Sequence, residues 1–282
     1  MKLGFVTCVE LGMACMEAIY EVNGSLDLVI TLQDHVGTKK SGRIYLDDFC
    51  SEKKIQLHKV LNINEEETIQ LIKSSQIDWL FIIGWSQIAS IDVLNASNLG
   101  ALGMHPTLLP IGRGRAAIPW AIIKGLSKTG VTLFKLDEGV DTGPILGQIE
   151  IPLTQDINAT DLYELCNQAH VELIKNIIPL LDSPVGIQLY QQDNTHATFW
   201  PGRTPEDGII SKQMTCKEVD TLVRALTRPY PGAYIQKADG TELRIWKGYI
   251  KSMEQRSHPL TSKELEIELF DGMYVIKDWE IM

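Results

Sequence analysis

The alternation of apolar runs with helix-like segments in the first half of the chain most restricts its fold. Runs typical of buried strands occur at residues 2–7, 26–32, 55–60 and 77–85, and residues 11–22 between the first two runs have a helical pattern. Strands that alternate with helices along a chain are typical of a parallel sheet with helices on its faces. We therefore expect an α/β domain built on a doubly wound, mostly parallel sheet.

The same pattern continues to about residue 181. Residues 99–105 and 129–137 are expected to form a fifth and a sixth strand. Asn64 and Glu67 have the spacing of a capping box, which predicts that a helix begins near Asn64. Apolar residues recur at helical spacing over residues 159–181, and this predicts a long helix that packs on the sheet.

The composition changes after this helix. Proline and glycine are dense in the segments SPVG, WPGRTPEDG and RPYPG, which indicates turns and a linker. Strand-like runs follow at residues 233–236, 241–250 and 265–278 and are typical of an antiparallel sheet. We expect two domains, an α/β domain over residues 1–205 and a small, mainly β domain over residues 206–282.

Charge and cysteine content argue against several classes of protein. The 26 basic and 36 acidic residues give a net charge of −10, which opposes binding to nucleic acid because phosphates repel an acidic surface. The five cysteines are scattered and form no CxxC pair, so we expect neither disulfides nor a metal site, and a cytoplasmic location. No apolar run has the roughly 18 residues that a membrane span needs, so no membrane partner is expected.

Two polar residues follow neighbouring strands of the predicted sheet. His105 ends the fifth strand, and Asp141 follows the sixth strand in a glycine-bordered turn. Each residue taken alone is more often structural, as a strand end or an Asx turn. Ligands of open α/β sheets bind beyond the carboxyl ends of the strands, where we expect both side chains to lie. There they could form the histidine–carboxylate pair that acid–base catalysis uses.

The segments HPTLLPIGRGRAAIPWAI and KTGVTLFKLDEGVDTGPIL, which place His105 and Asp141 36 positions apart, resemble the formyltransferases that use N10-formyltetrahydrofolate. The resemblance implies a Rossmann-like formyltransferase domain, followed by the smaller C-terminal domain of several branches. Two branches remain, the methionyl-tRNA formyltransferases and the sugar N-formyltransferases. The acidic charge, the short C-terminal part and the segments RGRAAIPW and PGRTPEDGII favour the sugar branch.

The resemblance implies transfer of a formyl group from N10-formyltetrahydrofolate to the amine of a UDP- or dTDP-linked deoxyamino sugar. Such sugars serve the biosynthesis of surface polysaccharides and nonulosonic acids. His105 would stabilise the formyl oxyanion or accept the amine proton, and Asp141 would orient His105. The partners are then a folate and a nucleotide sugar. No metal is implied, and a homodimer is compatible with the resemblance.

The resemblance also implies which residues contact the two small molecules. Arginines near the histidine suit a diphosphate, because a guanidinium binds phosphate through two hydrogen bonds. The expected folate contacts are Trp85, Gln87, Ile88, Leu136, Glu138, Val140 and Asp141, and the expected contacts of the nucleotide sugar are Met104, Arg113, Arg115 and Arg203.

Gly103 departs from the pattern of the family, which has an asparagine two residues before the histidine. That asparagine helps to hold the formyl oxygen. Another donor then replaces it, for which Ser86, Gln87, a backbone N–H and a water are candidates, or the chain is a non-catalytic binder of folate or nucleotide sugar. We expect an active enzyme, because His105, Asp141 and the loops on the substrate side are all retained.

Overall fold

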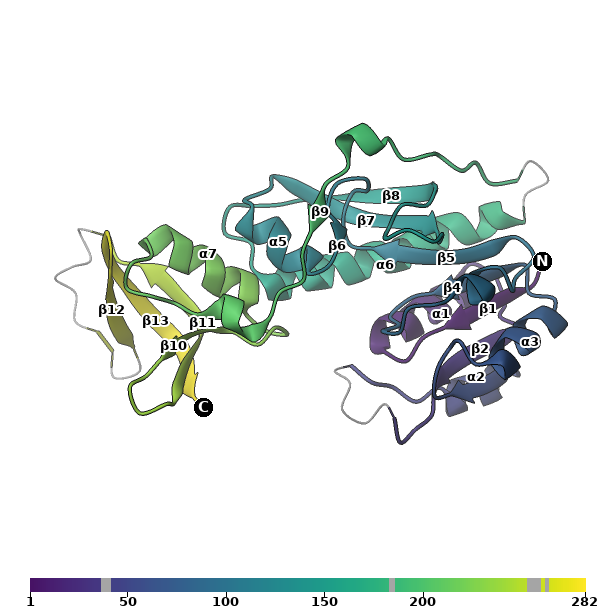
Figure 1. Ribbon diagram of the computed structural model, residues 1–282, viewed down its shortest axis with the longest axis horizontal. Coiled ribbons are helices and arrows are strands. Elements are labelled where there is room, and N and C mark those ends of the chain that lie inside the picture. The colour runs from purple at the N-terminus through teal and green to yellow at the C-terminus, as the bar shows by residue number, and fades with distance from the viewer. Residues whose placement is uncertain (37–41, 183–185, 253–259, 262–263) are drawn as a thin grey trace. The chain divides into compact units, whose positions relative to one another are not determined.

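The computed structural model describes residues 1–36, 42–182, 186–252, 260–261 and 264–282 (Figure 1). Contacts between Cα atoms divide the chain into two compact units. The first unit comprises Met1–Arg113, Gly130–Ile151 and Cys166–Phe199, and the second comprises Gly114–Thr129, Pro152–Leu165 and Trp200–Met282. The domain boundary expected between residues 205 and 206 stays a prediction.

The first unit is built on a seven-stranded sheet with the order β3-β2-β1-β4-β5-β7-β8. Strands β1 to β5 pair in parallel, and β7 pairs with β5 antiparallel. Every residue of β1 and β2 is buried, as expected for strands covered on both faces. The strands are β1 (Leu3–Val6), β2 (Leu28–Leu32), β3 (Gln56–Val60), β4 (Trp79–Ile82), β5 (Gly100–His105), β7 (Lys128–Lys135) and β8 (Ile145–Pro152). The expected mostly parallel α/β sheet is thus confirmed.

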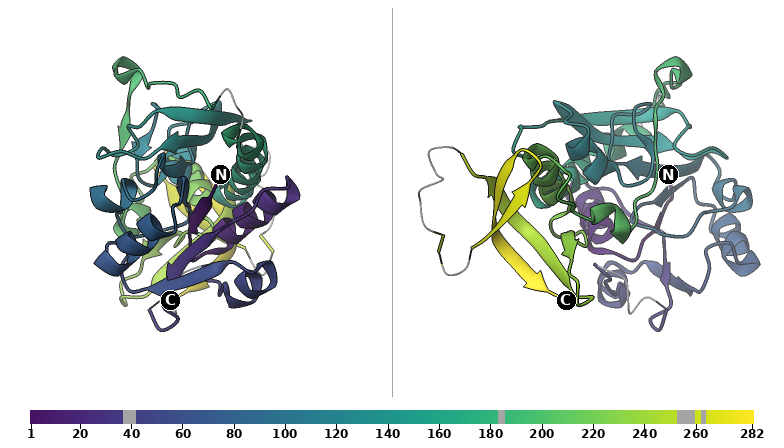
Figure 2. Two further views of the ribbon diagram at one scale, coloured as in Figure 1. Left: turned by 90° about the vertical axis from the view of Figure 1, so that its right-hand side faces the viewer. Right: turned by 60° about the vertical axis from the view of Figure 1, so that its left-hand side comes forward.

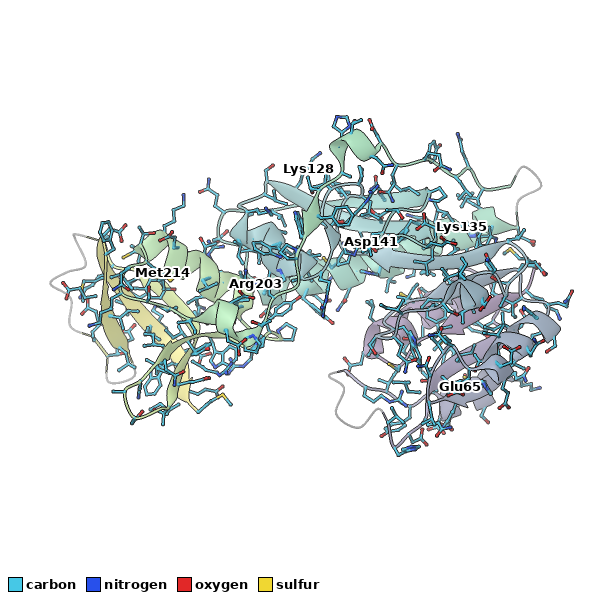
Figure 3. The ribbon with its side chains drawn as sticks, in the orientation of Figure 1. Glu65, Lys128, Lys135, Asp141, Arg203 and Met214 are labelled. Atoms are coloured by element: carbon cyan, nitrogen blue, oxygen red, sulfur yellow. The ribbon has the colours of Figure 1, made fainter. Side chains whose placement is uncertain are left out.

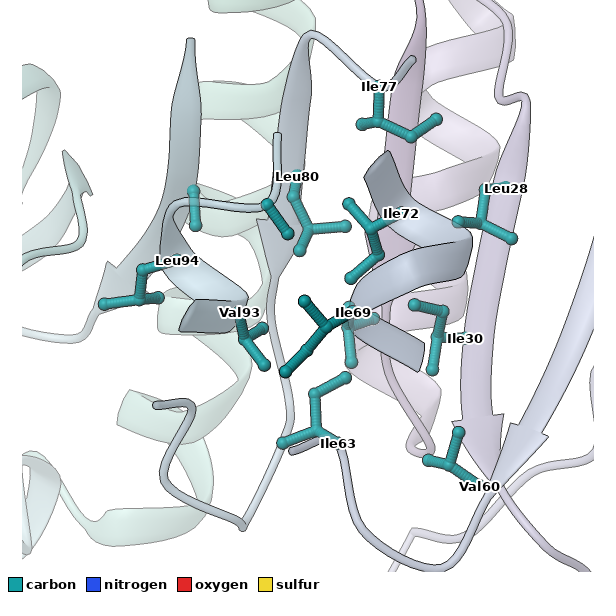
Figure 4. Packing of buried hydrophobic residues seen from close by; sticks show 13 residues of the cluster. Leu28, Ile30, Val60, Ile63, Ile69, Ile72, Ile77, Leu80, Val93 and Leu94 are labelled. Atoms are coloured by element: carbon teal, nitrogen blue, oxygen red, sulfur yellow. The ribbon is translucent and has the colours of Figure 1, made fainter. Parts of the chain in front are cut away.

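Helices connect and cover these strands. On one face, side chains of α3 and α4 pack against apolar side chains of the strands, including Leu28, Ile30 and Leu80 (Figure 4). The helices are α1 (Glu10–Glu21), α2 (Asp47–Lys53), α3 (Glu66–Ser74), α4 (Ile91–Leu94) and α6 (Ala159–Leu181). Helix α6 has the bounds that the apolar spacing predicts. Among the described residues, no helix combines the length and apolar character that crossing a membrane requires.

The capping box expected at the start of α3 is wrong. The helix begins at Glu66, after an N-cap Glu65 whose side chain makes no capping hydrogen bond within the helix. The Asn64 side chain instead donates to Ile88 O at 2.9 Å and accepts from Ser90 N–H at 2.7 Å. Asn64 therefore joins two loops, because partners from a distant segment satisfy its amide.

The second unit contains a four-stranded antiparallel sheet with the order β10-β11-β13-β12 (Figure 2). Helix α7 (Cys216–Leu226), which the sequence analysis did not predict, begins with a capping box of Thr215 and Glu218. The other elements are α5 (Ala117–Ile123), β10 (Ala233–Gln236), β11 (Glu242–Ile250), β12 (Leu265–Leu269), β13 (Gly272–Ile281) and the short helix η2 (Pro205–Gly208). The expected antiparallel C-terminal sheet is confirmed. Short strands β6 (Arg113–Gly114) and β9 (Phe199–Trp200) pair with each other.

Candidate functional site

His105 is the last residue of β5 and is buried, with 8% of its surface exposed. Its Nε2 lies 2.8 Å from the carbonyl oxygen of Gly112. A carbonyl oxygen can only accept, so Nε2 carries a proton and donates it in this hydrogen bond. The other ring nitrogen, Nδ1, lies 3.6 Å from Asp141 Oδ2. The structure thus brings His105 and Asp141 together, at a distance slightly longer than a hydrogen bond.

Asp141 reaches the histidine by a route that the sequence analysis did not foresee. In the antiparallel pairing of β5 with β7, His105 lies opposite Thr132 and Lys135 lies opposite Leu102. The expectation that both strands end at the same edge of the sheet is therefore wrong. The loop over residues 136–144 carries Asp141 back to the histidine (Figure 3 labels Lys135 and Asp141).

The first aspartate of this loop, Asp137, holds the turn in shape. Its Oδ1 accepts hydrogen bonds from Gly139 N–H at 3.0 Å and from Thr142 Oγ1 at 2.7 Å. A Cβ atom added to Gly139 would lie only 1.9 Å from Thr142 Oγ1. Asp141 itself has a φ of +54°, in the left-handed region that few side chains adopt. The two aspartates of the motif thus have different contacts: Asp137 stabilises the loop, and Asp141 faces His105.

A segment distant in sequence, residues 190–198, contacts both loops of this site. The Gln192 Nε2 donates to Asp141 O at 2.9 Å and to Gly143 O at 2.7 Å. The Gln192 Oε1 accepts from Arg113, whose Nη2 also donates to Asn194 Oδ1 at 2.8 Å. The sequence analysis missed Gln192, which follows the long helix without any motif. Only its amide side chain could have suggested a bridging role.

Arg113 does not face solvent, although the sequence analysis expected it at a diphosphate. It is 3% exposed, and its Nε and Nη2 are hydrogen-bonded to Gln192 and Asn194. A contact from these nitrogens to phosphate would require the internal hydrogen bonds to break. The guanidinium carbon of Arg113, Cζ, also lies 5.9 Å from the ring centroid of Phe199.

Of the expected folate contacts, Trp85 and Leu136 are half-buried and pack against the same apolar core cluster of the sheet. Ile88 is 89% exposed and Val140 is 58% exposed. Glu138 lies in the exposed part of the loop that carries Asp141.

Gln87 makes two hydrogen bonds with the backbone after β3. Its Oε1 accepts from Ile63 N–H, and its Nε2 donates to Leu61 O, both at 2.8 Å. These two contacts use the amide oxygen and one of the two amide hydrogens. That Gln87 supplies an oxyanion donor stays a prediction.

The space beside Gly103 is occupied by an apolar side chain. A Cβ atom added to Gly103 would lie 2.7 Å from Leu136 Cδ2 and 3.1 Å from Leu136 Cγ. Gly103 and His105 lie on the same face of β5, because side chains alternate along a strand. Leu136 thus covers the position into which an asparagine side chain would project. Met104, which lies between Gly103 and His105 in the sequence, is half-buried.

Arg115 and Arg203 belong to the second unit. Arg115 is exposed, and its backbone N–H donates to Trp200 O at 3.1 Å. Arg203, labelled in Figure 3, donates from Nη2 to Asp207 O at 2.8 Å. Its guanidinium carbon, Cζ, lies 4.9 Å from the ring centroid of Trp120. Arg203 thus contacts two other residues of this unit, and its contact with the sugar stays a prediction, whereas Arg115 is exposed.

Comparison with known proteins shows which family has this fold. Residues 17–178 match the formyl transferase family, and residues 203–277 match the formyl transferase C-terminal domain. A methionyl-tRNA formyltransferase of Clostridioides difficile (strain 630) is 28% identical over 262 residues, which cover 91% of this chain and 82% of that protein.

Two solved structures share the fold at low identity. The N-formyltransferase from Helicobacter canadensis, crystallised with folinic acid and dTDP-3-aminofucose, is 17% identical with a TM-score of 0.71. The match covers 99% of this chain and 100% of that chain. A variant of HypX from Aquifex aeolicus is 17% identical with a TM-score of 0.68, and this chain, covered to 99%, spans 44% of that one. At such identities the two structures bear on the fold alone.

Proposed function

Because the chain belongs to the formyl transferase family, we propose that it transfers a formyl group from N10-formyltetrahydrofolate to the amine of a UDP- or dTDP-linked deoxyamino sugar. The observation that carries the chemistry is the buried His105 with its Nδ1 3.6 Å from Asp141 Oδ2. A histidine beside a carboxylate suits a reaction in which an amine must lose a proton.

The reaction forms a bond between the amine nitrogen and the formyl carbon, and it breaks the bond between that carbon and N10. His105 Nδ1 accepts a proton from the attacking amine, and the Asp141 carboxylate stabilises the imidazolium that results. The hydrogen bond from Nε2 to Gly112 O fixes the ring while this happens. The imidazolium then gives this proton to N10 as the bond between N10 and the formyl carbon breaks, so His105 returns to its neutral form and the protons balance.

The folate binds against Trp85 and Leu136, which present apolar surface above the core of the sheet. The exposed side chains of Ile88, Glu138 and Val140 are positioned on loops that can adapt to the ring and its tail. Leu136, Glu138 and Val140 lie in the sequence motif that carries Asp141, which supports their contacts. They remain proposals, as do the contacts of Met104 and Arg203 with the sugar.

Two observations support a nucleotide sugar as the acceptor. The net charge is −10, and acidic residues outnumber basic residues over residues 206–282 as well. A nucleotide sugar carries few phosphates, so a single exposed guanidinium such as that of Arg115 can bind its diphosphate.

A second candidate is formylation of methionyl-tRNA. It is favoured by the 28% identity to the Clostridioides difficile methionyl-tRNA formyltransferase. A third candidate is a binder of folate or nucleotide sugar that catalyses nothing, and it is favoured by Gly103 and the apolar Leu136 beside it. One assay separates the three candidates, because they predict a formylated sugar, formylated methionyl-tRNA and no formylated product.

The test is mass spectrometry of a panel of UDP- and dTDP-linked amino sugars and methionyl-tRNA, each incubated with the protein and N10-formyltetrahydrofolate. We expect one amino sugar to gain a formyl group, and we expect His105→Ala to abolish the product. Formylation of methionyl-tRNA instead would support the second candidate. Binding of folate without any formylated product would support the third.

A further inference from the structure

Strand pairing does not set the distance between the two side chains, because His105 ends β5 whereas Asp141 lies in the loop that follows the antiparallel strand β7. We propose that Gln192 is the positioning residue that sets this distance. The inference rests on the proposed function, because it concerns the same catalytic pair. It adds a residue that lies outside both sequence motifs.

On the aspartate side, Gln192 holds the backbone of the loop. An amide NH2 group has two hydrogens, and both are used, on Asp141 O at 2.9 Å and on Gly143 O at 2.7 Å. The two carbonyls lie on either side of Thr142. Because the backbone is held at two points around Asp141, its carboxylate is directed to one place.

On the histidine side, Gln192 acts through Arg113. The Gln192 Oε1 accepts from Arg113 Nε at 3.1 Å and from Arg113 Nη2 at 2.7 Å. Arg113 follows Gly112 in the chain, and the Gly112 carbonyl accepts the proton of His105 Nε2. The contacts therefore form a closed ring that runs from His105 through Gly112, Arg113 and Gln192 to Asp141 and back to His105.

The segment that carries Gln192 is attached at both ends by other hydrogen bonds. Tyr190 exchanges two backbone hydrogen bonds with Ile145, at 2.8 and 2.9 Å. At the other end, the Thr198 hydroxyl accepts from Gly112 N–H at 2.8 Å. A substitution of Gln192 should therefore leave the segment in place and change only what its side chain does.

The position requires a group that both donates and accepts. Glutamate has nearly the same shape and keeps an acceptor for Arg113, but it puts a carboxylate oxygen against the carbonyls of Asp141 and Gly143. Two acceptors facing each other repel, so the loop should move away from His105. Gln192→Glu thus breaks the aspartate side of the ring and keeps the histidine side.

The experiment compares Gln192→Glu with Gln191→Glu, which makes the same change of charge at the neighbouring, exposed position. The readouts are kcat and KM with the amino sugar that the protein formylates, and the 15N resonances of the His105 imidazole in the unliganded protein. We expect Gln192→Glu to lower kcat roughly tenfold to a hundredfold, as small misplacements of catalytic groups do. The KM for the folate should change little, and the imidazole resonances should shift. Gln191→Glu should behave like the natural protein.

A second variant, Gln192→Ala, introduces no charge and should shift the same imidazole resonances. If the resonances of His105 are the same in all these proteins, Gln192 does not position the pair and the inference is overturned. This readout needs no substrate. A shift of the resonances together with a protein that formylates no amino sugar would therefore refute the proposed function and leave the positioning role supported.

Discussion

At the scale of single residues, the surroundings of Gly103 limit how the proposed reaction could hold the formyl oxygen. The missing asparagine leaves no empty space, because Leu136 Cδ2 lies 2.7 Å from the position of a Cβ atom on Gly103. Gln87 contacts the backbone after β3 through its amide oxygen and one amide hydrogen. In the proposed reaction the oxyanion would be stabilised by His105 together with a backbone N–H, water, Ser86 or the second amide hydrogen of Gln87.

This arrangement predicts that Gly103→Asn does not restore a missing part. The new side chain would push Leu136 from the core cluster, so kcat should stay level or fall, and the free energy of unfolding should fall by about 1 kcal/mol. Urea unfolding and steady-state kinetics measure both effects. Leu136→Ala is the control, and in the double variant the loss of stability should be smaller than the sum of the two. A large rise of kcat in Gly103→Asn would identify Gly103 as a lesion.

At the scale of elements, the long helix α6 places a second histidine inside the first unit. His170 is 5% exposed, and the contact between its Nδ1 and Cys166 O is 2.6 Å. The pKa of His170 is lowered from 6.5 to about 4, mainly by burial; the hydrogen bond with Cys166 O raises the pKa, and the electrostatic effect of His105 lowers it. The folded chain thus holds His170 neutral at a pH where the unfolded chain would protonate it.

The stability of the protein should therefore depend on pH through this helix. Between pH 6.5 and 4 the unfolded state binds more protons than the folded state, so the free energy of unfolding falls as the pH falls. From pH 7 to pH 5 His170 alone should remove about 2 kcal/mol. Urea unfolding at the two pH values should show that His170→Gln weakens this dependence. His35→Gln, at an exposed position, should not change it; equal slopes in all three proteins would contradict the assignment.

At the scale of the whole molecule, charge separates the candidate acceptors better than fold does. This chain is similar both to the Helicobacter canadensis N-formyltransferase in fold and to the Clostridioides difficile methionyl-tRNA formyltransferase in sequence. Affinity for nucleic acid comes largely from cations that neutralise phosphates, and this chain has a net charge of −10. The homodimer and the cytoplasmic location stay predictions.

The charge predicts that the protein does not form a stable complex with methionyl-tRNA at about 0.15 M salt, because few phosphates would be neutralised. Filter binding over a range of salt concentrations measures this directly. The Clostridioides difficile methionyl-tRNA formyltransferase serves as the positive control. A saturable complex whose affinity falls steeply with added salt would show a basic surface that the net charge conceals.

The sequence by itself predicted the buried strands of the α/β sheet, the long helix α6 and the C-terminal antiparallel strands, and it singled out His105 and Asp141 as a candidate pair. Buried strands such as β1 and β2 and the helix α6 follow from local apolar spacing, which depends only on neighbouring residues. His105 and Asp141 could be paired because each lies in a segment that resembles a known motif. Local patterns predict these strands and helices because the spacing of apolar residues reflects which side chains are buried and the periodicity of the backbone.

Only the tertiary structure decided how these parts meet. The direction of β7, the burial of Arg113, the side chain that covers Gly103 and the bridging role of Gln192 all depend on contacts between distant segments. Gln192 lies 51 positions from Asp141 and 79 positions from Arg113, so no local pattern could connect them. The physical reason is that a side chain's hydrogen-bond partners are chosen by packing, which brings together residues that the chain order keeps apart.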